Sequence, residues 1–238
     1  MHIAFFDLDN TLLAGDSDVA WGQFVVDEGW VDAESHARQS SGFHAQYAAG
    51  TLDIHAFQRF TLAPLFGRPW STLAAARERF VGDYIEPIIA PLASELVDRH
   101  VAAGHKTAII TATNRFIAEP IATRLGIDTL IATDPEYADG GYTGEIVGTP
   151  AYREGKIARV DQWLNEQSGQ AERTWFYSDS LNDLPLLRRV DMPVAVDPDT
   201  TLAAEARRAG WHVISLRTDS LPAIDAIPER AYGDQRAR

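Results

Sequence analysis

Residues 5–12 read FFDLDNTL, and this stretch decides the fold. An apolar run at residues 3–6 is typical of a buried strand, and it leads directly into Asp7 and Asp9. Side chains two apart on an extended chain point the same way, so one carboxylate can attack while its neighbour handles a proton. In open α/β sheets, ligands bind at the carboxyl ends of the strands. The stretch therefore predicts a strand-end site, although an Asp-rich turn that merely ends a strand would show the same pattern.

The rest of the chain alternates between short apolar runs and helical patterns, with one exception. The further predicted strands are residues 107–110, 129–132, 174–177, 194–196 and 212–215. Strands that alternate with helices indicate right-handed βαβ units and a mostly parallel sheet, so we expect an α/β fold. In the exception, residues 17–88, helix follows helix, which predicts an inserted helical cap domain; residues 1–16 and 89–238 then form the α/β core. Residues 134–150 predict a hairpin, and the Arg-rich residues from about 228 predict a loose end.

The composition is that of a folded globular chain, and its acidic balance limits the partners. Hydrophobic residues make up 45% of the 238 residues, and the absence of cysteine excludes disulfides, thiolate nucleophiles and cysteine-bound zinc. The net charge of −13 argues against nucleic acid and anionic membranes, because both require a basic surface. The N-terminus lacks the pattern of an export signal, and no window reaches the roughly 20 apolar residues of a membrane span. We therefore expect a cytoplasmic protein.

Hydroxyl side chains end the second predicted strand, just before a helix. A phosphate bound at Thr111 would meet a hydroxyl, free backbone N–H groups and the positive end of the helix dipole. The neighbouring Thr113 or Asn114 could instead serve only as the N-cap of that helix. This segment therefore predicts a phosphate site and leaves simple capping open.

A lysine and a second acidic motif complete the pattern. Lys156 is one of two lysines in the chain and lies near a helix start, where the dipole disfavours a cation; it could also be a solvated surface charge. The apolar run at residues 174–177 is followed by Asp179 and Asp183, with Asn182 between them. Placed opposite the first acidic pair, these oxygens would form the hard-ligand set that Mg²⁺ prefers.

Together the four motifs resemble those of the haloacid dehalogenase (HAD) superfamily, in the phosphoserine-phosphatase-like branch with a helical cap between the first two motifs. They are Asp7-x-Asp9-x-Thr11, the hydroxyl of Thr111, Lys156, and Asp179-x3-Asp183. The resemblance implies a Rossmann-like parallel-sheet core with an inserted all-helical cap, and a phosphatase that uses Mg²⁺. The stretches at 111–121 and 177–187 are most similar to bacterial members of the family, some of them histidinol-phosphate phosphatases.

The resemblance also implies a role for each motif residue. Asp7 is the nucleophile that forms an aspartyl-phosphate, and Asp9 protonates the leaving alkoxide and then activates water. Thr111 and Lys156 bind the phosphoryl oxygens. Mg²⁺ is held by Asp7, the backbone carbonyl of Asp9 and Asp179, and Asp183 completes the metal site or orients the lysine. The implied substrate contacts are Asp16, Asp18, Ala112 and Asn182.

Residues of the cap bear on the substrate, which we expect to be a small phosphate monoester. Asp16 and Asp18 stand where phosphoserine phosphatases carry an acid that faces the substrate amine, although helix N-capping would also explain them. Alignment of residues 50–53 with the similar cap segment places Thr61 where those enzymes carry a carboxylate-binding arginine, and Arg59 is two residues away. An amine-bearing ester such as histidinol phosphate is therefore favoured over phosphoserine.

The second carboxylate of the first motif, Asp9, distinguishes between the activities of the superfamily. Dehalogenases lack it and transport ATPases carry threonine there, so Asp9 favours a phosphatase or a phosphomutase. Phosphoserine phosphatase and a phosphomutase or phosphotransferase stay open as alternatives. A receiver-type phospho-acceptor module does not fit, because such modules are about half this length and have no helical cap.

Overall fold

The computed structural model describes residues 1–222, so the loose end expected from residue 228 lies outside the described part. Within these residues one sheet of seven strands runs in the order β4-β3-β2-β1-β5-β6-β7. The strands are β1 (His2–Phe6), β2 (Lys106–Asn114), β3 (Thr129–Ala138), β4 (Gly141–Val147), β5 (Arg173–Ser178), β6 (Met192–Val196) and β7 (His212–Ile214). All neighbours pair in parallel except β3 and β4, which form the predicted hairpin. The predicted α/β fold with a mostly parallel sheet is confirmed.

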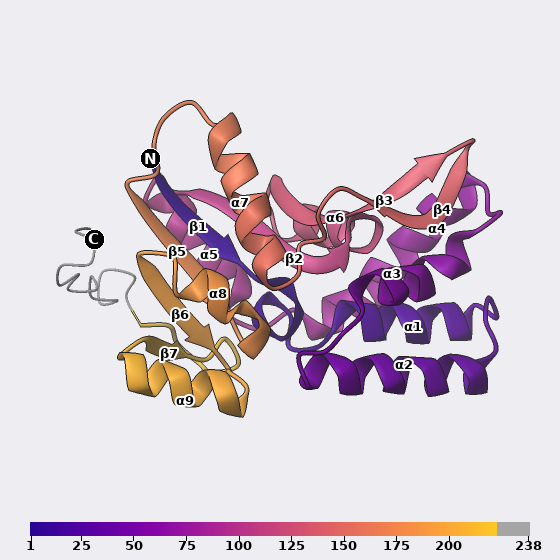
Figure 1. The fold of residues 1–238 in the computed structure, drawn as a ribbon, viewed down its shortest axis with the longest axis horizontal. Coiled ribbons are helices and arrows are strands. Elements are labelled where there is room, and N and C mark those ends of the chain that lie inside the picture. Colours follow the sequence, from indigo (N-terminus) through magenta and orange to yellow (C-terminus); the bar gives the residue numbers. More distant parts are fainter. Residues whose placement is uncertain (223–238) are drawn as a thin grey trace.

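Helices cover both faces of the sheet, as the sequence predicts. They are α1 (Ser17–Asp27), α2 (Ala33–Ala48), α3 (Ile54–Leu62), α4 (Trp70–Phe80), α5 (Ala93–Ala102), α6 (Arg115–Arg124), α7 (Glu154–Glu166), α8 (Leu184–Leu187) and α9 (Thr200–Ala209). Helices α7, α8 and α9 lie on one face, and α5 and α6 lie behind the sheet in Figure 1. None of the helices in residues 1–222 combines the length and the apolar character that a membrane span needs.

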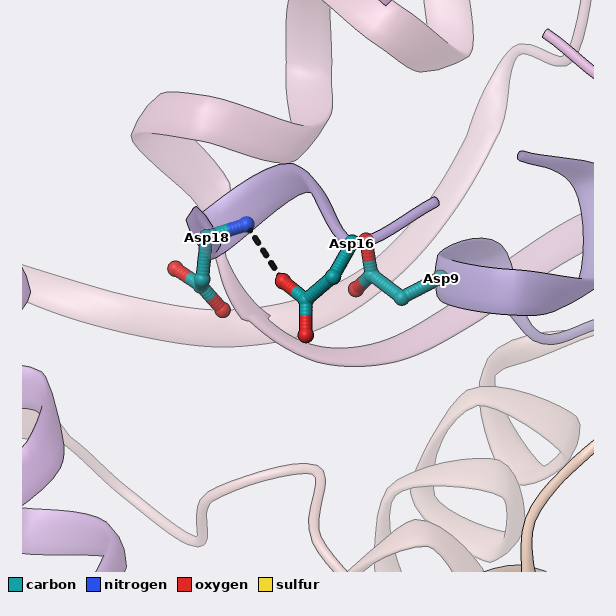
Figure 2. A group of neighbouring side chains, drawn as sticks. All are labelled: Asp9, Asp16 and Asp18. Atoms are coloured by element: carbon teal, nitrogen blue, oxygen red, sulfur yellow. Dashed lines mark hydrogen bonds between the residues drawn. The ribbon is translucent and has the colours of Figure 1, made fainter. Parts of the chain in front are cut away.

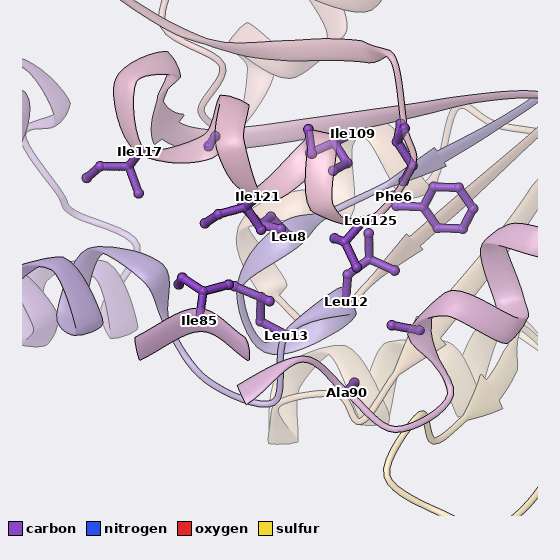
Figure 3. Close-up of a cluster of buried hydrophobic side chains, with 14 of the residues drawn as sticks. Phe6, Leu8, Leu12, Leu13, Ile85, Ala90, Ile109, Ile117, Ile121 and Leu125 are labelled. Atoms are coloured by element: carbon purple, nitrogen blue, oxygen red, sulfur yellow. The ribbon is translucent and has the colours of Figure 1, made fainter. Parts of the chain in front are cut away.

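The central strand β1 divides the core into two clusters because its side chains alternate between the faces of the sheet. Ile3 and Phe5 pack with the cluster under α7, α8 and α9. Ala4 and Phe6 belong to the larger cluster on the other side, which continues through the turn after β1 into α5 and α6 (Figure 3). All four side chains are fully buried. This packing fixes the end of β1, where the first acidic motif begins.

Residues 17–88 form helices α1 to α4 and short helical turns, without a strand in this stretch. These helices gather at one end of the sheet, beside the β3–β4 hairpin (Figure 1). Their interior is aromatic: Trp21 is 2% exposed and its ring packs against Phe24, Phe80 and Phe116 at centroid distances of 5.2 to 5.4 Å. Because Phe116 belongs to α6, this packing joins α1 and α4 to the sheet domain. The division of the chain into core and cap at residues 17 and 88 stays a prediction.

Candidate active site

One cavity opens where the loops after β1, β2 and β5 meet helices α1, α2 and α3. Its lining includes nine of the ten residues that the sequence singles out: Asp7, Asp9, Asp16, Asp18, Thr111, Ala112, Lys156, Asn182 and Asp183. The tenth, Asp179, lies beside it and is linked to the first motif through Thr11, whose hydroxyl donates to the carboxylate at 3.3 Å. The backbone N–H of Asp179 donates in turn to the Thr11 oxygen at 3.0 Å.

Lys156 lies at the buried centre of the site. Its Nζ donates to a carboxylate oxygen of Asp7 and to one of Asp183, both at 2.8 Å, and the three side chains are at most 6% exposed. Burial would lower the pKa of the lysine, but the charges of Asp183 and Asp7 outweigh it, so the pKa is raised and the ammonium stays charged. The predicted lysine is therefore no solvated surface charge, and it holds both acidic motifs together.

The carboxylates around this lysine outnumber it. Burial raises the pKa of Asp7 to about 7, with Lys156 opposing the shift and Asp183 adding to it. Burial also raises the pKa of Asp179 to about 9, with further contributions from Asp7 and Asp183. Asp183 itself accepts from the hydroxyl of Ser178 at 2.6 Å. When ionised, the buried Asp7 and Asp183 and the partly buried Asp179 leave an excess of negative charge near one ammonium, and their hard oxygens fit a Mg²⁺ ion, which would offset that excess.

A second acidic group lies on the cap side of the cavity (Figure 2). An oxygen from each of Asp9, Asp16 and Asp18 lies within 4.8 Å of the others, so these carboxylates too could hold a cation. The hydroxyl of Thr113 lies 2.8 Å from Asp9 and 2.9 Å from Asp18, although its single proton serves one carboxylate at a time. The backbone N–H of Ser17 donates to the other oxygen of Asp9 at 2.6 Å. The Asp9 carboxylate is therefore held toward the cap, away from Lys156.

The two cap-side acids differ in their local role. Asp16 is the N-cap of α1, because its side chain accepts from the N–H groups of Asp18 and Val19 at 2.8 and 3.0 Å. One oxygen of Asp18 is buried without a hydrogen-bond partner. Burial and then the charge of Asp9 raise the pKa of Asp16 to about 7, and burial followed by the charges of Asp16 and Asp9 raises that of Asp18 well above its ordinary value. Both acids would gain from a positive charge in the cavity.

The end of β2 supplies backbone and hydroxyl groups to the cavity floor. The pairing of β2 with β3 shifts register between Ile110 and Asn114, which releases the chain around Thr111 from the ladder. The Thr111 oxygen accepts from the N–H of Thr113 at 3.1 Å, so its own proton stays available to a ligand. Asn114 is the N-cap of α6 and accepts from the N–H of Ile117 at 3.2 Å. Asn114 therefore serves as the helix cap, and the neighbouring Thr111 keeps its hydroxyl proton for a ligand.

Contacts between the cap and the core close one side of the cavity. The hydroxyl of Tyr47 donates to Ser180 at 3.2 Å, and the side-chain amide of Asn182 donates to the Tyr47 carbonyl at 3.2 Å. The guanidinium of Arg153 donates to the carbonyl of Gly50 at 2.7 Å. Helix α2 therefore ends against the loop that carries the fourth motif.

Several lining residues are missing from the sequence prediction. Phe43 and Tyr47 lie on one face of α2, four residues apart, and Phe57 lies on α3. Helical spacing groups such residues on one face, but it does not tell a face that packs in a core from one that faces a ligand. The amide of Gln58 is a further omission: it is fully buried and donates to the Ala112 carbonyl at 3.0 Å, which fixes α3 on the end of β2.

The two residues weighed for carboxylate binding lie apart. Thr61 is buried and lines the cavity, where the side-chain amide of Asn114 donates to its hydroxyl at 3.4 Å. Arg59 instead pairs with Glu145 of the hairpin at 3.2 Å, and both side chains are about half exposed. Arg59 is therefore directed away from the cavity. Among the described residues that line the cavity, Lys156 is the one lysine and no arginine is present.

Comparison with known proteins agrees with this geometry. The model of the haloacid dehalogenase-like hydrolase family matches residues 4–188. A histidinol-phosphatase from Neisseria meningitidis is 46% identical over 91% of this chain and 99% of its own length. A phosphoserine phosphatase from Mycobacterium tuberculosis is 32% identical over 94% of this chain and 74% of its own length. A crystal structure of a Bordetella pertussis protein of unknown function matches with a TM-score of 0.84 at 43% identity, covering 90% of this chain and 98% of that one. The chain therefore belongs to the haloacid dehalogenase-like hydrolase family, as one of its phosphatases.

Proposed function

We propose that the protein hydrolyses a small phosphate monoester bearing a cationic amine, with Mg²⁺ as cofactor and an aspartyl-phosphate on Asp7 as intermediate. Histidinol phosphate, or a similar amino-alcohol phosphate, is the favoured substrate. The observation that carries the reaction is the buried contact of Lys156 with Asp7 and Asp183 at the carboxyl ends of the strands. It holds a carboxylate nucleophile beside a cation that can bind the phosphoryl group.

The positions of five side chains support the proposed reaction. A carboxylate oxygen of Asp7 attacks phosphorus and forms an acyl phosphate as the ester oxygen leaves, while Lys156 and the Thr111 hydroxyl hold the phosphoryl oxygens. Asp9 gives its proton to the departing alkoxide. The same carboxylate then takes a proton from water, which attacks phosphorus, releases inorganic phosphate and restores Asp7. Asn182, inside the fourth motif on the loop after β5, contacts the substrate where this loop meets the cap.

The carboxylates of Asp7 and Asp179, with the Asp9 backbone carbonyl, would hold Mg²⁺, and Asp183 completes the group. Bound there, the ion supplies positive charge that lets an anionic ester approach clustered carboxylates. The contact of Tyr47 with the fourth-motif loop closes one side of the cavity, which would limit the access of bulk water to the acyl phosphate.

The cap-side acids support an amine on the substrate. Asp18 has a buried oxygen without a partner, and Asp16 and Asp9 lie beside it, whereas Lys156 on the cavity lining is paired with Asp7 and Asp183. A positive charge near these three acids would neutralise them. A substrate ammonium would supply that charge. A substrate carboxylate finds no partner on the Thr61 side, because Arg59 is engaged by Glu145. The similarity to a histidinol-phosphatase at 46% identity points the same way.

Phosphate release with and without metal tests the reaction. We expect the purified protein to hydrolyse p-nitrophenyl phosphate and L-histidinol phosphate in Mg²⁺, and to lose at least about 100-fold in kcat/KM when EDTA removes the ion, because the uncompensated carboxylates then repel the ester. Readdition of Mg²⁺ should restore the rate. Metal-independent hydrolysis would contradict the proposed cofactor, and phosphoserine as the best of a phosphate-ester panel would contradict the proposed substrate.

Substitution of Asp18 tests the amine site separately. Asp18→Asn keeps the volume of the side chain and removes its charge, so we expect a loss of about 10- to 100-fold in kcat/KM for L-histidinol phosphate, the range of a lost charge-assisted hydrogen bond. Hydrolysis of p-nitrophenyl phosphate, which has no amine, should change less than about 3-fold. The matched control is Asp98→Asn on the exposed side of α5. Equal losses on both substrates would show that Asp18 only positions Asp9.

A further inference from the structure

The cavity has a second, apolar half that neither phosphate nor amine binding uses. Cap residues supply it: Val19 from α1, Phe43 from α2, Leu52 before α3, and Ile54 and Phe57 from α3. Asp7, Asp183 and Lys156 line the opposite, core side. A substrate with its phosphate at Asp7 therefore extends its leaving group toward this apolar wall.

The aromatic part of the wall is held in place by its own packing. The ring centroids of Phe43 and Phe57 lie 5.5 Å apart with the planes at 67°, and those of Phe43 and Phe60 lie 5.3 Å apart. The first pair is edge-to-face and the second is tilted at 37°, and such aromatic contacts favour particular ring orientations. Phe43 and Phe60 also border a groove on the outside of the cap, whereas Phe57 lines the catalytic cavity without bordering that groove. Phe57 is thus the ring committed to the catalytic side.

A leaving group that is only a short amino alcohol does not match this wall. Such a group would satisfy the acids at Asp16 and Asp18 and leave the rings facing water, which forgoes roughly 25 cal/mol for each Å² of apolar surface that a ligand could cover. A flat ring on the leaving group would cover the exposed faces of Phe43 and Phe57, and its nitrogen substituent would still reach the acids.

We infer that the leaving group carries a flat ring in addition to its cationic amine, and that Phe57, supported by Phe43, is the residue that selects for this ring. This inference rests on the proposed function and narrows its substrate class. Asp18 selects for charge and Phe57 selects for shape, from α1 and α3 respectively, so the two preferences are separable by mutation.

Three phosphate esters separate the two preferences: L-histidinol phosphate has an amine and a ring, phosphoethanolamine has only the amine, and phenyl phosphate has only the ring. The wild-type kcat/KM for L-histidinol phosphate should exceed that for phosphoethanolamine by at least about 100-fold, as expected for a ring that fills an apolar pocket. Phe57→Ala should lower kcat/KM by about 30-fold for L-histidinol phosphate and by a similar factor for phenyl phosphate. Phosphoethanolamine should change less than about 3-fold, and this unchanged rate also shows that the variant is folded.

The matched control is Phe66→Ala, because Phe66 is also a cap phenylalanine but is 45% exposed and does not line this cavity. It should leave all three substrates unaffected. Phe57→Leu, which keeps apolar volume but no flat face, should fall between wild type and Phe57→Ala. Equal losses on all three substrates in Phe57→Ala, or a wild-type enzyme that does not prefer the ring, would overturn the inference while hydrolysis itself stands. No metal-dependent hydrolysis of any ester would instead overturn the proposed function.

Discussion

Replacement of Asp7 by asparagine is expected to lower kcat by at least about 10⁴-fold on every phosphate ester, because an amide cannot form the acyl phosphate and the other groups of the site cannot replace a lost nucleophile. Asp7 is 5% exposed, and one of its oxygens accepts from Lys156 at 2.8 Å, so the variant changes one charge within a preserved arrangement. Hydrolysis of p-nitrophenyl phosphate and of L-histidinol phosphate measures the loss.

The stability of the same variant separates chemistry from folding. Burial and the charge of Asp183 raise the pKa of Asp7, so its ionised carboxylate strains the folded state, and an amide removes that strain while Lys156 keeps Asp183 as a partner. We expect Asp7→Asn to unfold at the same temperature as wild type or above it in metal-free buffer at pH 8. Asp98→Asn serves as the exposed control. A variant that folds and retains more than about 1% of wild-type kcat would rule out Asp7 as the nucleophile.

Acid-quenched protein offers a direct readout of the intermediate. During turnover, wild type should carry one phosphoryl group that hydroxylamine removes, as expected of an acyl phosphate, and Asp7→Asn should carry none. In the proposed mechanism Asp9 activates the water of the second step, so Asp9→Asn should accumulate the phosphorylated form when the leaving group needs no proton, as with p-nitrophenyl phosphate.

The motifs of the site could be predicted from the sequence because each one is local. An apolar run followed by polar residues marks a strand end whichever strands lie beside it, and this holds at Asp7, Thr111 and Asp179. The order of the strands is not local: β1 lies between β2 and β5 through contacts more than 100 residues apart in sequence. The family resemblance, which rests on the set of motifs, implied a Rossmann-like parallel sheet, and the structure gives the order of its strands.

The cap shows where local patterns are insufficient. Asp16 has the pattern of an N-cap, and the structure shows that it is one; the same carboxylate also lies on the cavity, because the cap helix begins at the site. Phe43 and Phe57 look like ordinary core residues in a helical pattern. Which face of α2 and α3 meets the core, and which meets a ligand, depends on how Gln58 and Tyr47 seat the cap on the β2 and β5 loops. Tertiary contacts of this kind leave no periodic signal.

Replacement of Lys156 by methionine is expected to lower both activity and stability. The loss of stability should grow as the pH rises and shrink when Mg²⁺ is added. The variant loses the cation that holds the phosphoryl group in the proposed mechanism, so kcat/KM should fall by at least about 10³-fold, the scale of one removed charge-stabilising group. It also leaves Asp7 and Asp183 buried without their ammonium partner, which should lower the free energy of unfolding by about 3–5 kcal/mol in metal-free buffer at pH 8.

The sign of the pH dependence follows from the raised pKa values. In wild type, the pKa of Asp7 is raised to about 7 and that of Asp179 to about 9, so between pH 4 and those values the folded state binds more protons than the unfolded state. The free energy of unfolding therefore falls as the pH rises through this window. It should fall further in Lys156→Met, because the pKa values of these carboxylates are higher still without the ammonium. The difference in the free energy of unfolding between wild type and Lys156→Met should be smaller at pH 5.5 than at pH 8. Mg²⁺ should reduce this difference at pH 8. Urea unfolding at the two pH values measures both effects.

Two further variants make the interpretation specific. Lys106→Met changes the other lysine of the chain, which is exposed and bonded to Gln167, and it should alter neither activity nor the pH slope. The double variant Lys156→Met/Asp183→Asn removes one of the two orphaned charges, so it should regain part of the stability at pH 8 and stay inactive. A Lys156→Met protein as stable as wild type at pH 8 would mean that the carboxylates are neutral there without the lysine. The charge excess that favours Mg²⁺ in the proposed mechanism would then not exist.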